Sequence, residues 1–270
     1  MIGYLGPEGT YSEIAASQLS PKEKKMAFES FPLLINALKK GEIDSAAIPV
    51  ENSVNGAVTQ NLDLLQDLHG VCAVASCTVK IDHRLVTKKG ADKSKIKRIY
   101  SHAQALGQCS RYLNEHFPAA ILMQVQSTSG CLNEIKGEED AGIVGSQCAR
   151  AGFELSKECI SDEKNNYTLF LLAVRGQPDL NRHTDRIFFS LTCRHEVGAL
   201  VKMLTHLSEN GLNMTKIESR PVKSRVWEFR FFIEVEGDYS KPEVRAAIEK
   251  VGVMASSFKL LGCYKVQSEK

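Results

Sequence analysis

The sequence predicts an α/β protein made of a two-lobed first part and a smaller second domain with the ferredoxin-like plan. Over residues 1–176, short apolar runs alternate with amphipathic helical stretches, which is typical of mostly parallel sheets covered by helices. A polar linker at residues 177–185, which follows Gly176 and contains Pro178, ends this pattern. Residues 186–266 then follow the order strand, helix, strand, strand, helix, strand. Two groups of strands before this segment predict two lobes, with a ligand-binding cleft between them.

The elements of the first part follow from hydrophobic spacing and from residues that start or stop helices. A strand is predicted at residues 1–5, and a helix at residues 10–19 follows a glycine-rich turn. Ser30 caps the next helix, Pro32 suits its first turn, and Gly41 ends it. Further strands are predicted at residues 45–48, 71–79, 85–87, 96–100, 121–125, 141–144 and 167–174. Further helices are predicted within residues 52–68 and at residues 104–117, 127–136 and 147–152.

The second domain is predicted from two helical stretches set among four apolar strands. Asn210 and Gly211 end the first of these helices. The strands are predicted at residues 186–192, 213–220, 226–234 and 257–266, and the helices at residues 196–210 and 242–251. This order makes the segment a domain of its own rather than a tail.

Composition places the chain among globular proteins without a strong electrostatic field. Of its 270 residues 43% are hydrophobic, and the formal net charge is +2, so neither nucleic acid nor a membrane is an expected partner. No apolar run approaches the roughly 18 residues that a membrane span needs, and the amino terminus does not read as a signal peptide. A cytoplasmic location is therefore expected. The eight cysteines lack metal-ligand spacing, which favours buried thiols over disulfides or a metal site.

Four polar clusters lie where predicted strands end, which is where α/β proteins place ligand contacts. Residues 6–12 join the first strand to a helix, and their glycines suit either a tight turn or an anion site. Their spacing matches neither a Rossmann fingerprint nor a P-loop. Glu51 and Asn52 follow a buried strand, and His102 follows another, although a lone histidine is more often structural than catalytic. Residues 127–129 open a helix as a cap or as an anion cradle.

Together, these segments resemble the prephenate dehydratase family, whose motifs they match in the same order. The matching segments are Gly6-Pro7-Glu8-Gly9-Thr10-Tyr11-Ser12, Ile48-Pro49-Val50-Glu51-Asn52-Ser53 with Gly56, Ser101-His102-Ala103-Gln104-Ala105-Leu106 with Cys109, Ser127-Thr128, and Asn165-Asn166-Tyr167-Thr168-Leu169-Phe170. Two departures stand out. Ser129 and Gly130 replace the alanines usual in the fourth motif, and Leu169 stands where the family's Asn-x-Thr-Arg-Phe signature has arginine.

The resemblance implies a catalytic domain over residues 1–176 that is related to periplasmic-type binding proteins. It implies conversion of prephenate to phenylpyruvate, with loss of water and carbon dioxide, in L-phenylalanine biosynthesis. This carbon–oxygen lyase reaction needs no cofactor and no metal. Aromatisation drives both losses, so the enzyme mainly protonates the leaving hydroxyl and orients the ring. By resemblance, Thr168 contacts that hydroxyl, with Glu51 and His102 in supporting roles. The implied substrate contacts are Thr10, Ser12, Asn52, Ser127, Thr128 and Phe170.

The resemblance extends to residues 186–266, which look like an ACT regulatory domain. Gly198-Ala199-Leu200-Val201 and Glu218-Ser219-Arg220-Pro221 stand where that family carries its phenylalanine-binding motifs. Gly198 at a helix start allows close approach of a carboxylate, and Glu218 suits an ammonium group. The implied feedback inhibitor, L-phenylalanine, would contact Gly198, Ala199, Leu200, Glu218, Ser219 and Arg220. Because ACT domains usually pair, a homodimer or homotetramer with a shared ligand site is implied.

Leu169 bears on the rate of the implied reaction rather than on the family. Arginine is the side chain best shaped to hold a carboxylate, so its absence predicts a loss of about ten- to a hundredfold in kcat/KM. Lys164, Arg150 and Arg84 are candidates to replace it. Two other functions stay open on the same fold, a prephenate decarboxylase and a catalytically silent phenylalanine sensor. Arogenate stays open as an alternative substrate.

Overall fold

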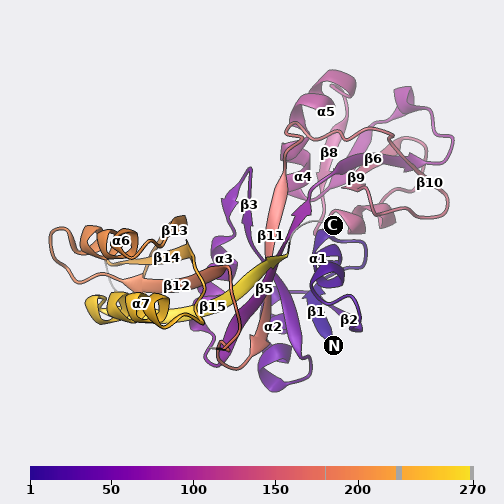
Figure 1. Ribbon diagram of the computed structural model, residues 1–270. Coiled ribbons are helices and arrows are strands. Elements are labelled where there is room, and N and C mark those ends of the chain that lie inside the picture. The colour runs from indigo at the N-terminus through magenta and orange to yellow at the C-terminus, as the bar shows by residue number, and fades with distance from the viewer. Residues whose placement is uncertain (180, 223–226, 268–270) are drawn as a thin grey trace.

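Two β-sheets form the frame of the molecule, and the larger one runs through the first lobe into the C-terminal part (Figure 1). The computed structural model describes residues 1–179, 181–222 and 227–267. The larger sheet has the strand order β13 (Met214–Pro221), β14 (Phe229–Glu236), β12 (Arg186–Thr192), β15 (Ser257–Gln267), β5 (Val71–Lys80), β11 (Tyr167–Arg175), β3 (Ser45–Asn52), β1 (Ile2–Leu5) and β2 (Lys25–Phe28), with β4 (Gly56–Ala57) beside β3. The smaller sheet, in the second lobe, has the order β10 (Phe153–Leu155), β6 (His83–Lys88), β9 (Asp140–Gly145), β7 (Arg98–Ser101) and β8 (Ile121–Gln124).

The first lobe packs helices on both faces of its part of the larger sheet. One face packs against α1 (Tyr11–Leu19), and the other packs against α2 (Phe31–Lys40) and α3 (Thr59–Asp67). The predicted limits of α2 are confirmed. The Ser30 hydroxyl accepts a hydrogen bond from the Leu33 N–H at 3.4 Å, and Gly41 ends the helix in the left-handed conformation, with φ of 81°.

Both sheets are mixed, which corrects the prediction of mostly parallel sheets. β1 is parallel to β2 and β3, but β11 is antiparallel to β3 and β5. In the smaller sheet, β6 is antiparallel to β9 and β10, whereas β7 is parallel to β8 and β9. The reversals arise where the chain passes between the lobes. β5 carries the chain into the second lobe and β11 brings it back, so these two paired strands run in opposite directions.

The second lobe contains less helix than predicted. The single helix expected at residues 104–117 is two short ones, α4 (Ala103–Gln108) and α5 (Ser110–His116), which meet at Cys109. None of the helices in the described part of the chain is long and apolar enough to cross a membrane.

The helices predicted for two segments of the second lobe are wrong. Residues 127–136 form only a 3₁₀ turn at Ser129–Asn133, and residues 147–152, all of them described, contain no helix. Serine, threonine and glycine favour caps and turns over helix interiors, because their side chains or free backbone compete with helical bonding. Gly152 adopts φ of 84°, a left-handed conformation that leads the chain into β10 instead.

The C-terminal part has the predicted ferredoxin-like order, with α6 (Ala199–Glu209) and α7 (Pro242–Met254) packed on one face of its strands. The strand predicted from Val226 is found from Phe229; Val226 itself, like Leu180 of the predicted linker, lies outside the described residues. β15 pairs in parallel with β5 and so joins this part to the first lobe. A Cβ at Gly262 would lie 2.5 Å from the Ala73 carbonyl oxygen, so this close pairing requires glycine.

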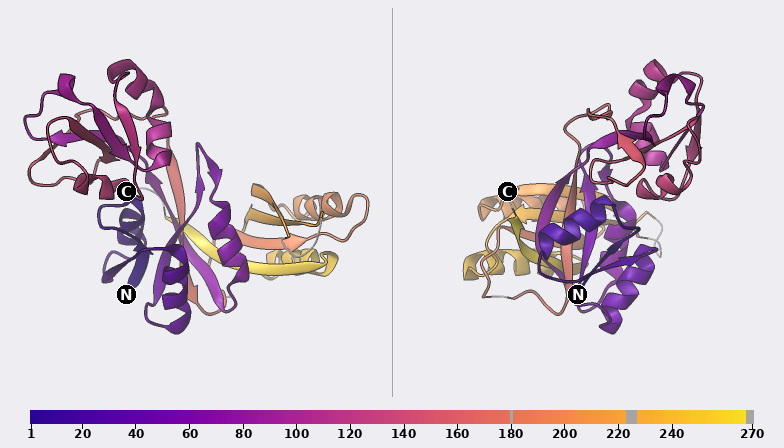
Figure 2. Two further views of the ribbon diagram at one scale, coloured as in Figure 1. Left: turned by 180° about the vertical axis from the view of Figure 1, so that it is seen from behind. Right: turned by 90° about the vertical axis from the view of Figure 1, so that its right-hand side faces the viewer.

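One hydrophobic core fills the contact between the first lobe and the C-terminal part. We call this region the seam. Phe188, Phe232 and Tyr264 of the C-terminal strands pack in one cluster with Leu34 of α2 and Leu62 of α3. None of the five is more than 2% exposed. The second lobe and the C-terminal part project from different sides of the first lobe (Figure 2). The first lobe therefore has two neighbours, one across an open cleft and one across a packed core.

Candidate active site

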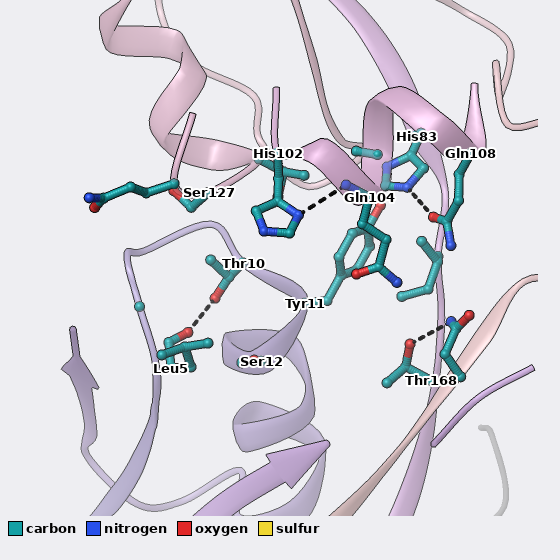
Figure 3. A pocket seen from close by; sticks show the side chains of 16 residues that line it. Leu5, Thr10, Tyr11, Ser12, His83, His102, Gln104, Gln108, Ser127 and Thr168 are labelled. Atoms are coloured by element: carbon teal, nitrogen blue, oxygen red, sulfur yellow. Dashed lines mark hydrogen bonds between the residues drawn. The ribbon is translucent and has the colours of Figure 1, made fainter. Parts of the chain in front are cut away.

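A cavity of about 240 Å³ lies between the two lobes and is lined mainly by neutral polar side chains (Figure 3). The first lobe contributes the ends of β1 and β3 and the starts of β11 and α1. The second lobe contributes the start of β6, α4 and the segment before the 3₁₀ turn. The predicted site residues that line it are Thr10, Ser12, Asn52, His102, Ser127, Thr128 and Thr168. Polar lining residues that were not predicted as site residues are Tyr11, His83, Gln104, Gln108 and Gln126.

A bulge in β3 turns Asn52 towards this cavity. Val50 is an extra residue that interrupts the pairing of β3 with β11, and its side chain is buried in the core of the seam. Side chains alternate along a strand, so without the bulge Asn52 would share the face of Val50. After the bulge, Asn52 lies opposite Thr168 and both line the cavity. Glu51 and Leu169, which also lie opposite each other, share the other face.

The amide of Asn52 fixes the hydroxyl of Thr168. The backbone N–H groups of Val54 and Asn55 donate to Asn52 Oδ1 at 3.1 and 3.0 Å. Because N–H groups cannot accept, they set the orientation of the amide and turn its Nδ2 towards Thr168. The two Nδ2 hydrogens are donated to three acceptors, Asn166 Oδ1 at 2.7 Å, Thr168 Oγ1 at 3.0 Å and the Tyr167 carbonyl at 3.1 Å. The Thr168 oxygen therefore accepts from the protein, and its own hydrogen stays available to a ligand.

The start of α1 presents backbone donors to the cavity. Thr10 is its N-cap residue, but the Thr10 hydroxyl donates to the Leu5 carbonyl at 3.0 Å instead of capping the helix. Among the described residues, the N–H groups of Tyr11 and Ser12 have no protein acceptor. They lie at the positive end of the helix dipole, where an anion gains about 0.3–1 kcal/mol. This helix start is therefore suited to a carboxylate.

The second lobe supplies the opposite wall through His102 and Ser127, which Figure 3 shows across the cavity from Thr10. The Gln104 N–H donates to His102 Nδ1 at 3.3 Å, so the neutral ring carries its hydrogen on Nε2 and can donate it. The Ser127 hydroxyl oxygen accepts from the Gly130 N–H at 3.0 Å. A Cβ at Gly130 would lie 2.5 Å from this oxygen, so glycine at this position allows the serine geometry.

A buried pair at the back of the cavity has spare hydrogen-bonding capacity. His83 Nε2 and Gln108 Oε1 are 2.9 Å apart, whereas His83 Nδ1 and Gln108 Nε2 have no partner among the described residues. Burial lowers the pKa of His83, so the ring is neutral near pH 7 and Nδ1 is an acceptor. Tyr11 ties α1 to the crossing between the lobes, because its hydroxyl donates to the Asp82 carbonyl at 2.9 Å. Gln108 lies within a matched motif, between Leu106 and Cys109, whereas His83 stands between the charged residues Asp82 and Arg84 and belongs to no matched motif.

No charged side chain is among the described residues that line the cavity. The three basic residues suggested in place of an arginine lie elsewhere. Arg84 pairs with Asp82 at 2.6 Å, Arg150 donates to Asn133 at 3.0 Å, and Lys164 is exposed. An anionic ligand in this cavity would therefore be held by neutral donors.

Two of the predicted site residues, Phe170 and Glu51, do not line the cavity, and neither does Leu169. Phe170 is 2% exposed and packs in the core beneath α1. Leu169 packs against the core of the seam, and Glu51 accepts a hydrogen bond from Lys216 at 2.8 Å. Position 169 thus faces away from the cavity, because neighbouring residues of a strand point to opposite faces. The reduced activity expected from Leu169 stays a prediction. In this geometry the side chain at position 169 does not contact a substrate in the cavity.

The residues predicted to bind phenylalanine lie on two elements of the C-terminal part. Gly198 precedes α6 with φ of 75°, and Ala199 and Leu200 begin that helix. Glu218, Ser219 and Arg220 lie on the edge strand β13. Glu218 pairs with Phe232 of the seam core, so it lies on the face turned to the first lobe, and Ser219 lies on the opposite face. Arg220 donates to Asp63 of α3 at 3.0 Å.

The family model for prephenate dehydratase matches residues 2–177. A bifunctional chorismate mutase/prephenate dehydratase of Neisseria gonorrhoeae is 34% identical over 271 residues, which cover 97% of this chain and 74% of the relative. A prephenate dehydratase of Amycolatopsis methanolica is 30% identical over 268 residues, which cover 97% of this chain and 88% of the relative. The crystal structure of a prephenate dehydratase from Arthrobacter aurescens in complex with L-Phe aligns with a TM-score of 0.86 at 26% identity, covering 98% of this chain and 89% of that one.

Proposed function

The chain belongs to the prephenate dehydratase family, and we propose that its interlobe cavity turns prephenate into phenylpyruvate, with Thr168 assisting the leaving hydroxyl. The reaction is that of a hydro-lyase and supplies the carbon skeleton of L-phenylalanine. The observation that carries the assignment of Thr168 is the 3.0 Å bond from Asn52 Nδ2 to Thr168 Oγ1. It leaves the hydroxyl hydrogen of Thr168 free on the cavity side.

The electrons of the reaction move from the ring carboxylate to the ring hydroxyl. The bond between ring and carboxylate breaks, carbon dioxide leaves, and its electron pair completes the aromatic ring as the C–O bond to the hydroxyl breaks. One proton is consumed, because hydroxide leaves as water. Thr168 supplies this proton through its Oγ–H and is reprotonated from solvent. Threonine is a weak acid, so the amide of Asn52 assists by stabilising the charge that develops on Oγ1.

The neutral lining suits a reaction in which a carboxylate loses its charge. The ring carboxylate leaves as neutral carbon dioxide, so a cationic clamp on it would stabilise the substrate more than the transition state and oppose the reaction. Neutral donors orient the substrate but stabilise its charged carboxylate less than a cation would. The donors available are the N–H groups at the start of α1, the hydroxyls of Ser12, Ser127 and Thr128, and Nε2–H of His102. The unpartnered atoms of His83 and Gln108 add an acceptor and a donor.

A product assay tests this function. The purified protein is incubated with prephenate, and the products are followed by ultraviolet absorption and mass spectrometry. We expect aromatic phenylpyruvate at a rate that depends on Thr168. A non-aromatic decarboxylated product would show a decarboxylase instead, and unchanged prephenate would show a silent sensor. The same assay with arogenate, which would give phenylalanine directly, measures substrate preference.

The proposed regulator is L-phenylalanine, bound between two copies of the C-terminal part. The Arthrobacter aurescens relative holds L-Phe, and the two predicted binding motifs lie on separate elements of this chain. Exposed apolar side chains near these motifs offer a surface for a second copy: Val197, Val201, Met214, Ile217, Trp227 and Phe229. Burying them in a homodimer or homotetramer is favourable. Phenylalanine that changed neither the rate nor the melting temperature would contradict this regulation.

The proposed domains are a catalytic domain over residues 1–176, a linker over residues 177–185 and an ACT domain over residues 186–266. The family match, which ends at residue 177, supports the first limit. Because the seam core is shared, we expect a protease cut in the linker to leave the two fragments associated. A cytoplasmic location is also proposed, since the eight cysteines are free thiols, which suit a reducing compartment.

A further inference from the structure

A lysine of the C-terminal part reaches the bulge that orients Asn52. Lys216 Nζ donates to Glu51 Oε2 at 2.8 Å and to the Val50 carbonyl at 3.5 Å. The Lys216 side chain is only 8% exposed, whereas that of Glu51 is 41% exposed. A cation so far removed from water is costly without a partner, so this ion pair keeps both side chains in place. The Val50 carbonyl also accepts the Val58 N–H at 3.0 Å, so Lys216 adds to a bond within the first lobe.

The same bulge decides whether Asn52 can reach Thr168. If Val50 were drawn into regular pairing with β11, Asn52 would turn to the face of the seam and lose its bond to Thr168 Oγ1. A continuous run of contacts therefore joins Lys216 to the Thr168 hydroxyl. It passes through the ion pair with Glu51, one peptide bond to Asn52, and the amide hydrogen bond.

β13 carries Lys216 together with residues proposed to bind phenylalanine. Lys216 lies opposite Glu234 and Glu218 lies opposite Phe232, so the two side chains share the face turned to the first lobe. Among the described strands, β13 pairs with β14 alone. An edge strand is held on one side only and opens more readily than a central strand. A ligand that moves β13 therefore moves Lys216 against the bulge.

We propose that Lys216 is a positioning residue for Thr168 and that it carries the phenylalanine signal from β13 to the cavity through Glu51 and Asn52. The signalling half rests on the proposed binding of L-phenylalanine to the C-terminal part. The positioning half does not depend on that ligand, because the contacts from Lys216 to Thr168 are present in the unliganded chain.

A double-mutant cycle on the full-length protein tests the positioning half without phenylalanine. Lys216→Met removes the ammonium group and keeps the length of the side chain, and Glu51→Gln removes the charge of its partner. Each change is expected to lower kcat about tenfold and to alter KM for prephenate less than about twofold, because orientation of Thr168 rather than binding is lost. The double variant should be no slower than either single one. Lys216→Arg should restore most of kcat.

Lys259→Met is the matched control. The Lys259 ammonium lies in the same seam but donates to the carbonyls of Leu65 and Gln66 in α3, at 3.0 and 2.6 Å. Its loss should lower the melting temperature and leave kcat within about twofold of wild type. A similar fall of kcat in this variant would show a general effect of the seam. Independent, multiplying losses in the Lys216→Met and Glu51→Gln double variant would equally overturn the positioning role.

Calorimetric titration with L-phenylalanine tests the signalling half. Lys216→Met should bind phenylalanine with Kd within about threefold of wild type, while the maximal inhibition of kcat falls to less than about half. Binding and inhibition both equal to wild type would overturn the signal path. A wild-type protein that neither binds phenylalanine nor is inhibited by it would instead contradict the proposed regulation, and the cycle would still decide the positioning role.

Discussion

The cleft between the lobes and the seam between the first lobe and the C-terminal part contrast in chemistry, although both are built on β3 and β11. The cleft is lined by hydroxyls, amides and imidazoles, some of which have no partner among the described residues. The seam is an apolar core, and the cations Lys216, Arg220 and Lys259 that border it each donate to an acceptor of the first lobe. Unpaired polar groups are tolerated where a ligand enters, whereas a packed boundary requires every charge to be paired.

The contrast between cleft and seam arises from adjacent residues of β3 and β11, whose side chains point to opposite faces of the sheet. Asn52 and Thr168 face the cleft, whereas Glu51 and Leu169 face the seam, because the bulge at Val50 resets the alternation in β3. Substitutions at two adjacent residues of the same strand therefore affect different properties of the protein. Changes on the cleft face should alter the chemical step, and changes on the seam face should alter stability and coupling.

Removal of the Thr168 hydroxyl should have the largest effect. Thr168→Ala is expected to lower kcat by about 10²–10⁴-fold, the range of a lost general acid. Thr168→Ser keeps the O–H group and should stay within about tenfold of wild type. Steady-state phenylpyruvate formation measures both. Thr78→Ala makes the same chemical change opposite Leu169 on the seam face and should leave kcat within about twofold. If Thr168→Ala and Thr78→Ala were equally active, the assignment of Thr168 would be wrong.

Asn52→Asp tests the direction of the hydrogen bond to Thr168. The two side chains have the same shape, but the carboxylate oxygen facing Thr168 accepts instead of donating. The Thr168 hydrogen would then turn away from the substrate, so kcat should fall about a hundredfold with a smaller change in KM. Kinetics and circular dichroism of the variant separate this loss from misfolding. Wild-type kcat in a folded variant would show that the Asn52 amide is not needed.

The sequence predicted most of the cleft residues but not their arrangement. Polar clusters at strand ends and the family resemblance indicated residues from Thr10 to Thr168 that do line one cavity. Regular alternation could not foresee that Asn52 and Val50 lie on opposite faces, because the extra residue of a bulge has no distinct sequence signal. His83 was missed because it lies before the predicted strand at residues 85–87, between the charged residues Asp82 and Arg84. Its partner Gln108 comes from a distant helix, which only the fold brings close.

Acid should destabilise the protein partly through His83 at the back of the cleft. Burial lowers the pKa of His83 in the folded state, so the unfolded state binds the proton more tightly. The buried neutral His83 therefore does not lower the free energy of unfolding above pH 6.5, the ordinary pKa of histidine. As the pH falls below that value, protonation of His83 in the unfolded state lowers the free energy of unfolding. Urea unfolding at pH 7.5 and about pH 5 should show a smaller acid loss in His83→Gln than in wild type. The exposed His69→Gln control should retain the full loss, and equal acid losses in all three would contradict this role.

The kinetics of Leu169→Arg test most directly the claim that adjacent residues of β11 serve different regions. The new guanidinium would lie on the seam face opposite Glu51, where it competes with Lys216 rather than reaching the substrate. We expect kcat/KM for prephenate to change less than about threefold, with Leu169→Met as the uncharged control. A rise of about ten- to a hundredfold would show instead that position 169 holds a substrate carboxylate, and that the two faces are not separate.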